Sequence, residues 1–205
     1  GISESFRAIR TNIQYLNSEK ENKIISISSS ISGEGKTYCS MNLASVFALS
    51  GSKTLLMGAD MRKPKIFSDF QLNNDKGLSN YLSSQIKKEE MIQKSDIENL
   101  DIILSGPTPP NPAELLDKQL MQSLLKELQK EYKYIIIDTP PIGLVTDGLI
   151  LMKYTDVNLY IIRQKYSNKS MLDYVTSLFK QKEIKQINLV VNDIDENSMH
   201  YGYGY

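Results

Sequence analysis

The sequence predicts a three-layer α/β/α fold built on a central, mostly parallel sheet. Six short apolar runs are continuous rather than alternating, which is typical of strands covered on both faces. Segments with the period of an amphipathic helix separate these runs, and strands that alternate with helices pair in parallel. The expected strands are 23–28, 54–58, 100–105, 133–138, 157–163 and 187–192, and the expected helices are 38–49, 113–131, 145–153 and 168–182.

Length and composition indicate a single globular domain over residues 1–205. Lys plus Arg and Asp plus Glu both total 24, and this zero net charge argues against nucleic acid as a partner. The single cysteine, Cys39, rules out a disulfide framework within the chain and suits a reducing compartment. No apolar run approaches the roughly 20 residues that cross a bilayer, so we expect a soluble protein.

The loop after the first expected strand carries the residue types that bind nucleotide phosphates. Gly33 and Gly35 let backbone N–H groups approach a phosphate, and the start of the following helix adds a favourable dipole. Lys36 is placed to reach the outer phosphates, and Thr37 offers a hydroxyl to Mg²⁺. A glycine-rich turn before an ordinary helix is the alternative interpretation, and Ser30 replaces the glycine of the strict consensus. The candidate nucleotide-binding residues here are Ser32, Gly33, Glu34, Gly35, Lys36, Thr37 and Tyr38.

The expected strand 133–138 ends on a second candidate, Asp138. A carboxylate at the carboxyl end of a buried strand, near a phosphate loop, can hold Mg²⁺ or its waters. The alternative is a helix N-cap, a common role of such an aspartate. The residues "TPP" that follow cannot continue a strand and force a sharp loop. Taken with the phosphate loop, Asp138 makes nucleotide binding a specific prediction.

These features together resemble the bacterial tyrosine kinases of capsule and exopolysaccharide assembly. The resemblance implies a P-loop NTPase fold related to the MinD and ParA group, with ATP and Mg²⁺ as cofactors. It runs along nearly the whole chain and includes "GADMRKP", "IIIDTPP" and the aspartate Asp147 that follows it. The other matching segments are "ESFRAIRTNI", "GEGKT", "KGLSNYL", "GPTPPNPAELL", "VVND" and the terminal tyrosines.

The resemblance gives a role to the N-terminus. Glu4, Arg7 and Arg10 match a family motif on an N-terminal helix, here expected over 3–19, that packs against the neighbouring subunit in a ring-like homo-oligomer. From spacing alone, the same three residues indicate only a solvated helix face.

The resemblance also gives a role to the C-terminus. It implies that Tyr201, Tyr203 and Tyr205, in an expected flexible tail over 196–205, are phosphorylated by a neighbouring subunit. Glycine spacing suits a tail whose hydroxyls visit one site in turn. His200 is the only histidine, so no histidine triad or multi-histidine metal site is available.

The chain departs from the family after its second strand, where most members carry two aspartates. Asp60 matches the second, but Gly58 stands in place of the first, which is proposed to orient the attacking tyrosine and help hold Mg²⁺. General-base assistance is worth about 10²–10⁴-fold, whereas most of the catalysis of phosphoryl transfer comes from positioning and charge neutralisation. We therefore expect reduced or rearranged catalysis rather than none. The predicted catalytic residues are Lys36, Asp60, Arg62 and Asp138, and the predicted metal ligands are Thr37, Asp60 and Asp138.

The base pocket is less well defined by sequence. Asn192 is placed like residues that contact adenine in related folds, and Arg163 is a second candidate. Both could equally be capping or surface residues. Lys63 and Lys65 are interpreted as part of a solvated basic loop.

Two other functions fit the sequence. One is an ATPase switch of the MinD and ParA kind, although the extra lysine typical of that group's phosphate loop is absent. The other is a nucleotide-binding pseudokinase, which Gly58 favours. The resemblance alone implies a transmembrane polysaccharide co-polymerase or adaptor segment as partner, fused or separate. It implies a cytoplasmic location at the inner face of the plasma membrane.

Overall fold

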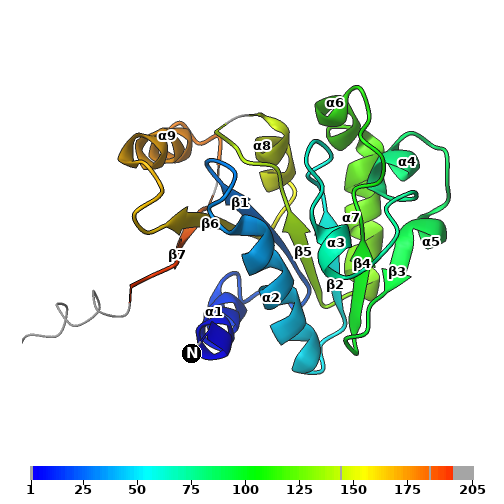
Figure 1. Ribbon diagram of the computed structural model, residues 1–205, viewed down its shortest axis with the longest axis horizontal. Coiled ribbons are helices and arrows are strands. Elements are labelled where there is room, and N and C mark those ends of the chain that lie inside the picture. The colour runs from blue at the N-terminus through cyan, green and yellow to red at the C-terminus, as the bar shows by residue number, and fades with distance from the viewer. Residues whose placement is uncertain (1, 144, 185, 196–205) are drawn as a thin grey trace, which may run out of the picture.

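A computed structural model describes residues 2–143, 145–184 and 186–195. Within these residues, seven strands form one sheet in the order β3-β4-β2-β5-β1-β6-β7 (Figure 1). Only the edge pair β3 and β4 is antiparallel, so the predicted mostly parallel sheet is confirmed. The strands are β1 (Lys23–Ser29), β2 (Thr54–Gly58), β3 (Ile92–Lys94), β4 (Leu100–Ile103), β5 (Tyr134–Asp138), β6 (Val157–Arg163) and β7 (Asn188–Asn192).

Helices cover both faces of the sheet, as the continuous apolar runs require. Ile25 and Ile27 of β1 pack with α1 and α2 on one face, whereas Ile24 belongs to the core that α7 covers on the other. The helices are α1 (Ile2–Tyr15), α2 (Lys36–Leu49), α3 (Ile66–Asp69), α4 (Leu78–Leu82), α5 (Lys88–Met91), α6 (Pro112–Leu116), α7 (Gln119–Glu131), α8 (Asp147–Met152) and α9 (Lys169–Lys180).

The strand register sets the position of the site. Ile27 of β1 and Gly58 of β2 both pair with Asp138 of β5, so β2 and β5 end at the same level and β1 ends two residues beyond them. The chain then leaves β1 for α2 and β2 for α3 at this edge (Figure 1). Ligand sites in parallel sheets form at such carboxyl ends.

Several predicted boundaries are wrong for local reasons. The helix expected over 113–131 divides into α6 and α7, because Lys118 takes an extended backbone conformation between them. The helix expected over 3–19 ends at Tyr15, and Asn17 has a φ of +52°, which no helix continues. The strand expected over 100–105 ends at Ile103. The three-residue β3 was not predicted, because so short a segment has no measurable period.

None of the described helices combines the length and the apolar character that a bilayer span requires. The predicted tail over 196–205, with Tyr201, Tyr203 and Tyr205, lies outside the described residues.

Candidate active site

The phosphate loop joins β1 to α2, and its two glycines are fixed by their surroundings. Gly33 and Gly35 have φ angles of +93° and +95°, in the left-handed region that favours glycine. A Cβ on Gly33 would lie 2.7 Å from the hydroxyl oxygen of Tyr166, and a Cβ on Gly35 would overlap the side chain of Asn192. The backbone conformation therefore favours glycine at both positions, and a Cβ at either would also have to displace Tyr166 or Asn192.

The start of α2 places two predicted residues against the predicted carboxylate. The Lys36 ammonium donates to Oδ1 of Asp138 at 2.6 Å, and the Thr37 hydroxyl donates to Oδ2 at 2.9 Å. A third donor, the Ser40 hydroxyl, reaches Oδ1 at 3.2 Å and was not predicted. Lys36 and Asp138 are both buried, so their charges are only weakly screened by water.

The loop after β2 is organised differently. Oδ1 of Asp60 accepts the backbone N–H groups of Arg62 at 3.2 Å and Lys63 at 3.0 Å. Arg62 makes a bidentate ion pair with the buried Asp147, with its Nε 2.9 Å from Oδ2 and its Nη2 3.2 Å from Oδ1. This hydrogen bonding raises the pKa of Arg62 above its ordinary value. Asp147 had no role assigned from sequence.

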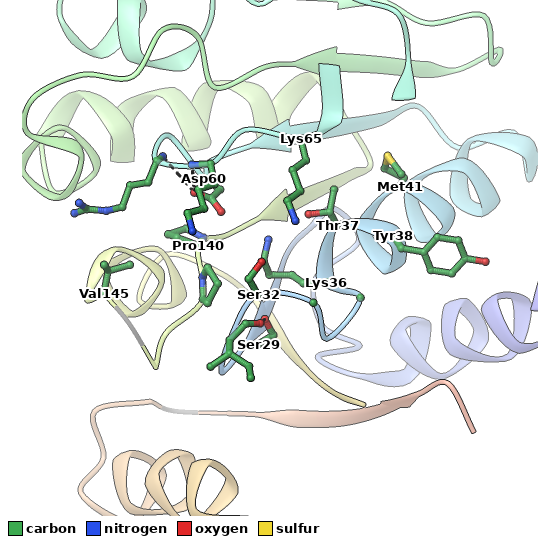
Figure 2. Close-up of a pocket in the computed structure, with 16 residues that line it drawn as sticks. Ser29, Ser32, Lys36, Thr37, Tyr38, Met41, Asp60, Lys65, Pro140 and Val145 are labelled. Atoms are coloured by element: carbon green, nitrogen blue, oxygen red, sulfur yellow. Dashed lines mark hydrogen bonds between the residues drawn. The ribbon is translucent and has the colours of Figure 1, made fainter. Parts of the chain in front are cut away.

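A pocket of about 380 Å³ lies between these two loops, and Pro140, Pro141 and Val145 complete its wall. Asp60 and Arg62 line it together with the phosphate loop. In Figure 2 the amino ends of Lys36 and Lys65 point into the same space. Lys63 also lines it, so both lysines of the predicted solvated basic loop belong to the pocket wall.

The pocket suits a nucleoside triphosphate with Mg²⁺. Left-handed glycines and a helix start direct amides at an anion, and Lys36 adds a buried cation. The hard oxygens of Thr37, Asp60 and Asp138 are the ligands that Mg²⁺ prefers. Within the described residues, no cluster of three or more His, Cys, Asp or Glu offers a different metal site.

The two predicted adenine contacts are engaged elsewhere. Arg163 donates through Nη1 to the carbonyl of Gly33 at 3.1 Å, and Asn192 donates to the carbonyl of Glu34 at 3.0 Å. Neither residue lines the pocket. A contact with adenine therefore stays a prediction. Tyr38 does line the pocket, and its ring packs edge-on against Phe6 of α1 at 6.0 Å between centroids.

The three residues of the N-terminal motif lie along α1. Arg7 and Glu4 form an exposed ion pair at 3.4 Å, of the kind that contributes little to stability. Arg10 instead donates through Nη1 to the carbonyl of Val46 in α2 at 3.3 Å. The predicted ring interface stays a prediction.

Comparison with known proteins places the chain in a family. Residues 22–192 match the family model described as an AAA domain. The chain is 37% identical to the tyrosine-protein kinase YwqD of Bacillus subtilis, over 99% of this chain and 85% of that protein. It belongs to the bacterial tyrosine-protein kinase family.

Two solved structures support the same assignment. The kinase domain of the Escherichia coli tyrosine kinase ETK superposes with a TM-score of 0.89 at 32% identity, covering 99% of this chain and 80% of that one. The chimerical protein CapA2B2 superposes with the same TM-score at 36% identity, covering 95% and 86%. The predicted kinase family and fold class are therefore confirmed.

Proposed function

We propose that this protein is an ATP-dependent tyrosine autokinase, in which one copy phosphorylates the C-terminal tyrosines of another within a homo-oligomer. The observation that carries the proposal is the convergence of Lys36, Thr37 and Asp138 beside the glycine-rich loop. The acceptors are Tyr201, Tyr203 and Tyr205. The family's association with capsule and exopolysaccharide assembly supports a role in regulating polysaccharide synthesis and export.

The residues of the chain supply positioning and charge. Mg·ATP would provide the phosphoryl group and a metal that neutralises phosphate charge. Lys36 provides a buried cation at the phosphate loop, where a fixed charge stabilises developing negative charge most strongly. Thr37, Asp60 and Asp138 are the residues that would hold Mg²⁺. Arg62 lines the pocket and is held in place by Asp147.

Asp60 is the residue we assign to the attacking tyrosine hydroxyl. Its Oδ1 is engaged by two backbone amides, whereas its Oδ2 makes no hydrogen bond to another described residue. Oδ2 can therefore accept the phenolic proton, with the backbone holding the carboxylate in position. We expect Asp60→Ala to slow tail phosphorylation, and labelling at the parent rate would remove this role.

The decisive experiment mixes two variants of the full chain with Mg·ATP. The first variant keeps its kinase site but carries Tyr201→Phe, Tyr203→Phe and Tyr205→Phe. The second keeps the tail and carries Lys36→Met. We expect mass spectrometry to find phosphotyrosine on the second chain only when the first is present. No phosphate on the mixed sample, with labelling of the parent chain, would contradict transfer between copies.

One specific observation favours a second function, a nucleotide-binding pseudokinase. Position 58, the last residue of β2, carries no side chain, so Asp60 is the one carboxylate where the family resemblance implies a pair. The same assay separates the functions. Nucleotide binding without phosphotyrosine or ADP release would indicate the pseudokinase, and ADP release without phosphotyrosine would indicate an ATPase switch.

The family resemblance supports a membrane partner. We assign to this protein a cytoplasmic position at the inner face of the plasma membrane, through a transmembrane polysaccharide co-polymerase or adaptor segment, fused or separate. Nucleic acid is not among the proposed partners. Adding the cytoplasmic segment of such an adaptor should raise the rate of tail phosphorylation in the purified protein, and an unchanged rate would argue against it.

A further inference from the structure

Three side chains donate hydrogen bonds to successive backbone carbonyls of the phosphate loop, and none of these side chains lines the pocket. We call this side of the loop its outer side. The Tyr166 hydroxyl donates to the carbonyl of Ser32 at 3.0 Å. Arg163 donates to the carbonyl of Gly33 at 3.1 Å, and Asn192 donates to that of Glu34 at 3.0 Å. These donors come from the end of β6, the turn after it and the end of β7, all more than 120 residues away in sequence.

Glu34 adds a buried carboxylate to this arrangement. Its side chain is fully buried, and Oε2 accepts the N–H of Ile31 at 2.9 Å. Oε1 accepts the hydroxyl of Ser167, and that same hydroxyl accepts the N–H of Arg163 at 2.8 Å. Within the described residues no basic side chain forms an ion pair with Glu34. Leaving a buried carboxylate without hydrogen bonds is costly, so these two bonds favour the loop conformation in which both are made.

The direction of the three bonded carbonyls fixes the direction of the N–H groups that follow them in the chain. In a trans peptide unit the N–H lies opposite the C=O of the preceding residue. The carbonyls of Ser32, Gly33 and Glu34 are engaged on the outer side, so the N–H groups of residues 33–35 face the opposite way. None of these three N–H groups bonds to another described residue. They therefore remain available for an anion.

We infer that Glu34 and Ser167 are positioning residues that hold the amides of the phosphate loop ready for nucleotide phosphates. We call Glu34, Arg163, Tyr166, Ser167 and Asn192 the loop brace. The inference rests on the proposed nucleotide site, and it assigns these residues no contact with the reacting atoms. Their contribution is to reduce the ordering that binding would otherwise require.

The negative charge of Glu34 gives a sharp test, because a charge near the phosphates opposes binding whereas the hydrogen bonds favour it. Glu34→Gln removes the charge but can still accept from Ile31 and donate to the Ser167 hydroxyl. Glu34→Ala removes both hydrogen bonds. We therefore expect Gln at this position to bind ADP at least as tightly as the parent and Ala to bind more weakly.

The experiment measures ADP binding to the full chain by calorimetry. We expect Ser167→Ala to weaken binding about tenfold, the effect of losing one hydrogen bond to a charged group. Ser167→Thr, which keeps the hydroxyl, should restore most of the affinity. The matched control is Ser170→Ala, which removes an exposed hydroxyl three residues away. At saturating Mg·ATP, the phosphorylation rate of Ser167→Ala should match that of the control, because only positioning is lost.

Two results would overturn the inference. One is ADP affinity of Ser167→Ala within twofold of Ser170→Ala, and the other is Glu34→Gln binding as weakly as Glu34→Ala. If Glu34→Ala does not fold, the Ser167 series decides. Parent protein that binds ADP without phosphorylating its tail would refute the proposed kinase function and leave the loop brace intact. Tail phosphorylation by the parent, together with equal ADP affinities of Ser167→Ala and Ser170→Ala, would support the kinase function and refute the loop brace.

Discussion

The loop after β1 and the loop after β2 meet at the same pocket but are held in opposite ways. The loop after β1 is fixed from outside by residues of β6, β7 and the turn between β6 and α9. The loop after β2 is fixed mainly by its own backbone, through the two amides that bond to Asp60. The first loop is therefore held by distant parts of the chain, whereas the second holds itself and leaves Oδ2 of Asp60 without a hydrogen bond to another described residue.

The two regions also differ in the space around their glycines, as Gly58 at the end of β2 shows. A cavity of about 10 Å³ lies beside it, lined by Asp60, Ser105 and Asp138 among others. A Cβ on Gly58 would lie 3.4 Å from Ile66 and 3.6 Å from the backbone nitrogen of Ser105, which is ordinary contact. Position 58, at the end of β2, has room for a Cβ, whereas a Cβ on Gly33 or Gly35 would collide with the side chain of Tyr166 or Asn192.

The largest effect is expected from replacing Lys36, which directly follows the loop after β1. Lys36→Met removes the buried ammonium and leaves Asp138 with the hydroxyls of Thr37 and Ser40. We expect tail phosphorylation to fall by about 10²–10³-fold, the effect of losing one fixed transition-state donor. The measurement is phosphotyrosine formation over time, with Lys180→Met as a control that removes one exposed charge. An unchanged rate would contradict the assigned role of Lys36.

A faster phosphorylation rate is expected when a carboxylate is added at Gly58, the residue that precedes the loop after β2. Gly58→Asp places a second carboxylate at a position with room for a Cβ and a small cavity beside it, and we expect phosphorylation to accelerate at least about tenfold. Gly58→Asn, which has nearly the same size and no charge, is the control. If both variants react at the same rate, the missing carboxylate does not limit this protein.

The loop after β2 is also held by an ion pair between Arg62 and Asp147 of α8. Arg62→Gln removes the ion pair of the buried Asp147, and we expect the free energy of unfolding to fall by roughly 1–3 kcal/mol. Urea denaturation measures this loss. The double variant Arg62→Gln with Asp147→Asn should recover part of it, because no buried charge is then left unpaired. A single variant as stable as the parent would show that other groups satisfy Asp147.

The smallest effect is expected at Cys39, just inside α2. Burial, assisted by the charge of Asp138, raises the pKa of its thiol to about 11. A raised pKa favours the neutral thiol, so at pH 8 only about one molecule in a thousand carries the reactive thiolate. We expect iodoacetamide to modify the folded protein far more slowly than the urea-unfolded protein, as measured by mass spectrometry. Equal rates would contradict the burial of this thiol.

The sequence predicted the fold class because its signal is local. Continuous apolar runs marked six of the strands, and the boundaries of 54–58 and 157–163 agree with β2 and β6. Its errors were also local in origin, since the extended backbone at Lys118 and the left-handed Asn17 leave no period to detect. The antiparallel edge strand β3 was missed for the same reason.

The residues of the candidate site also fall into those that local sequence patterns predicted and those that only the structure brought together. The sequence alone determined the phosphate loop and the aspartate that ends β5, because glycine spacing, a lysine beside a helix start and a strand-ending carboxylate are patterns among neighbours in the chain. Only the tertiary structure decided that Arg62 pairs with Asp147, and that Ser167 bonds to Glu34. Residues 85 and 133 positions apart meet because the strand order places β2 beside β5 and β1 beside β6, and no local period encodes that order.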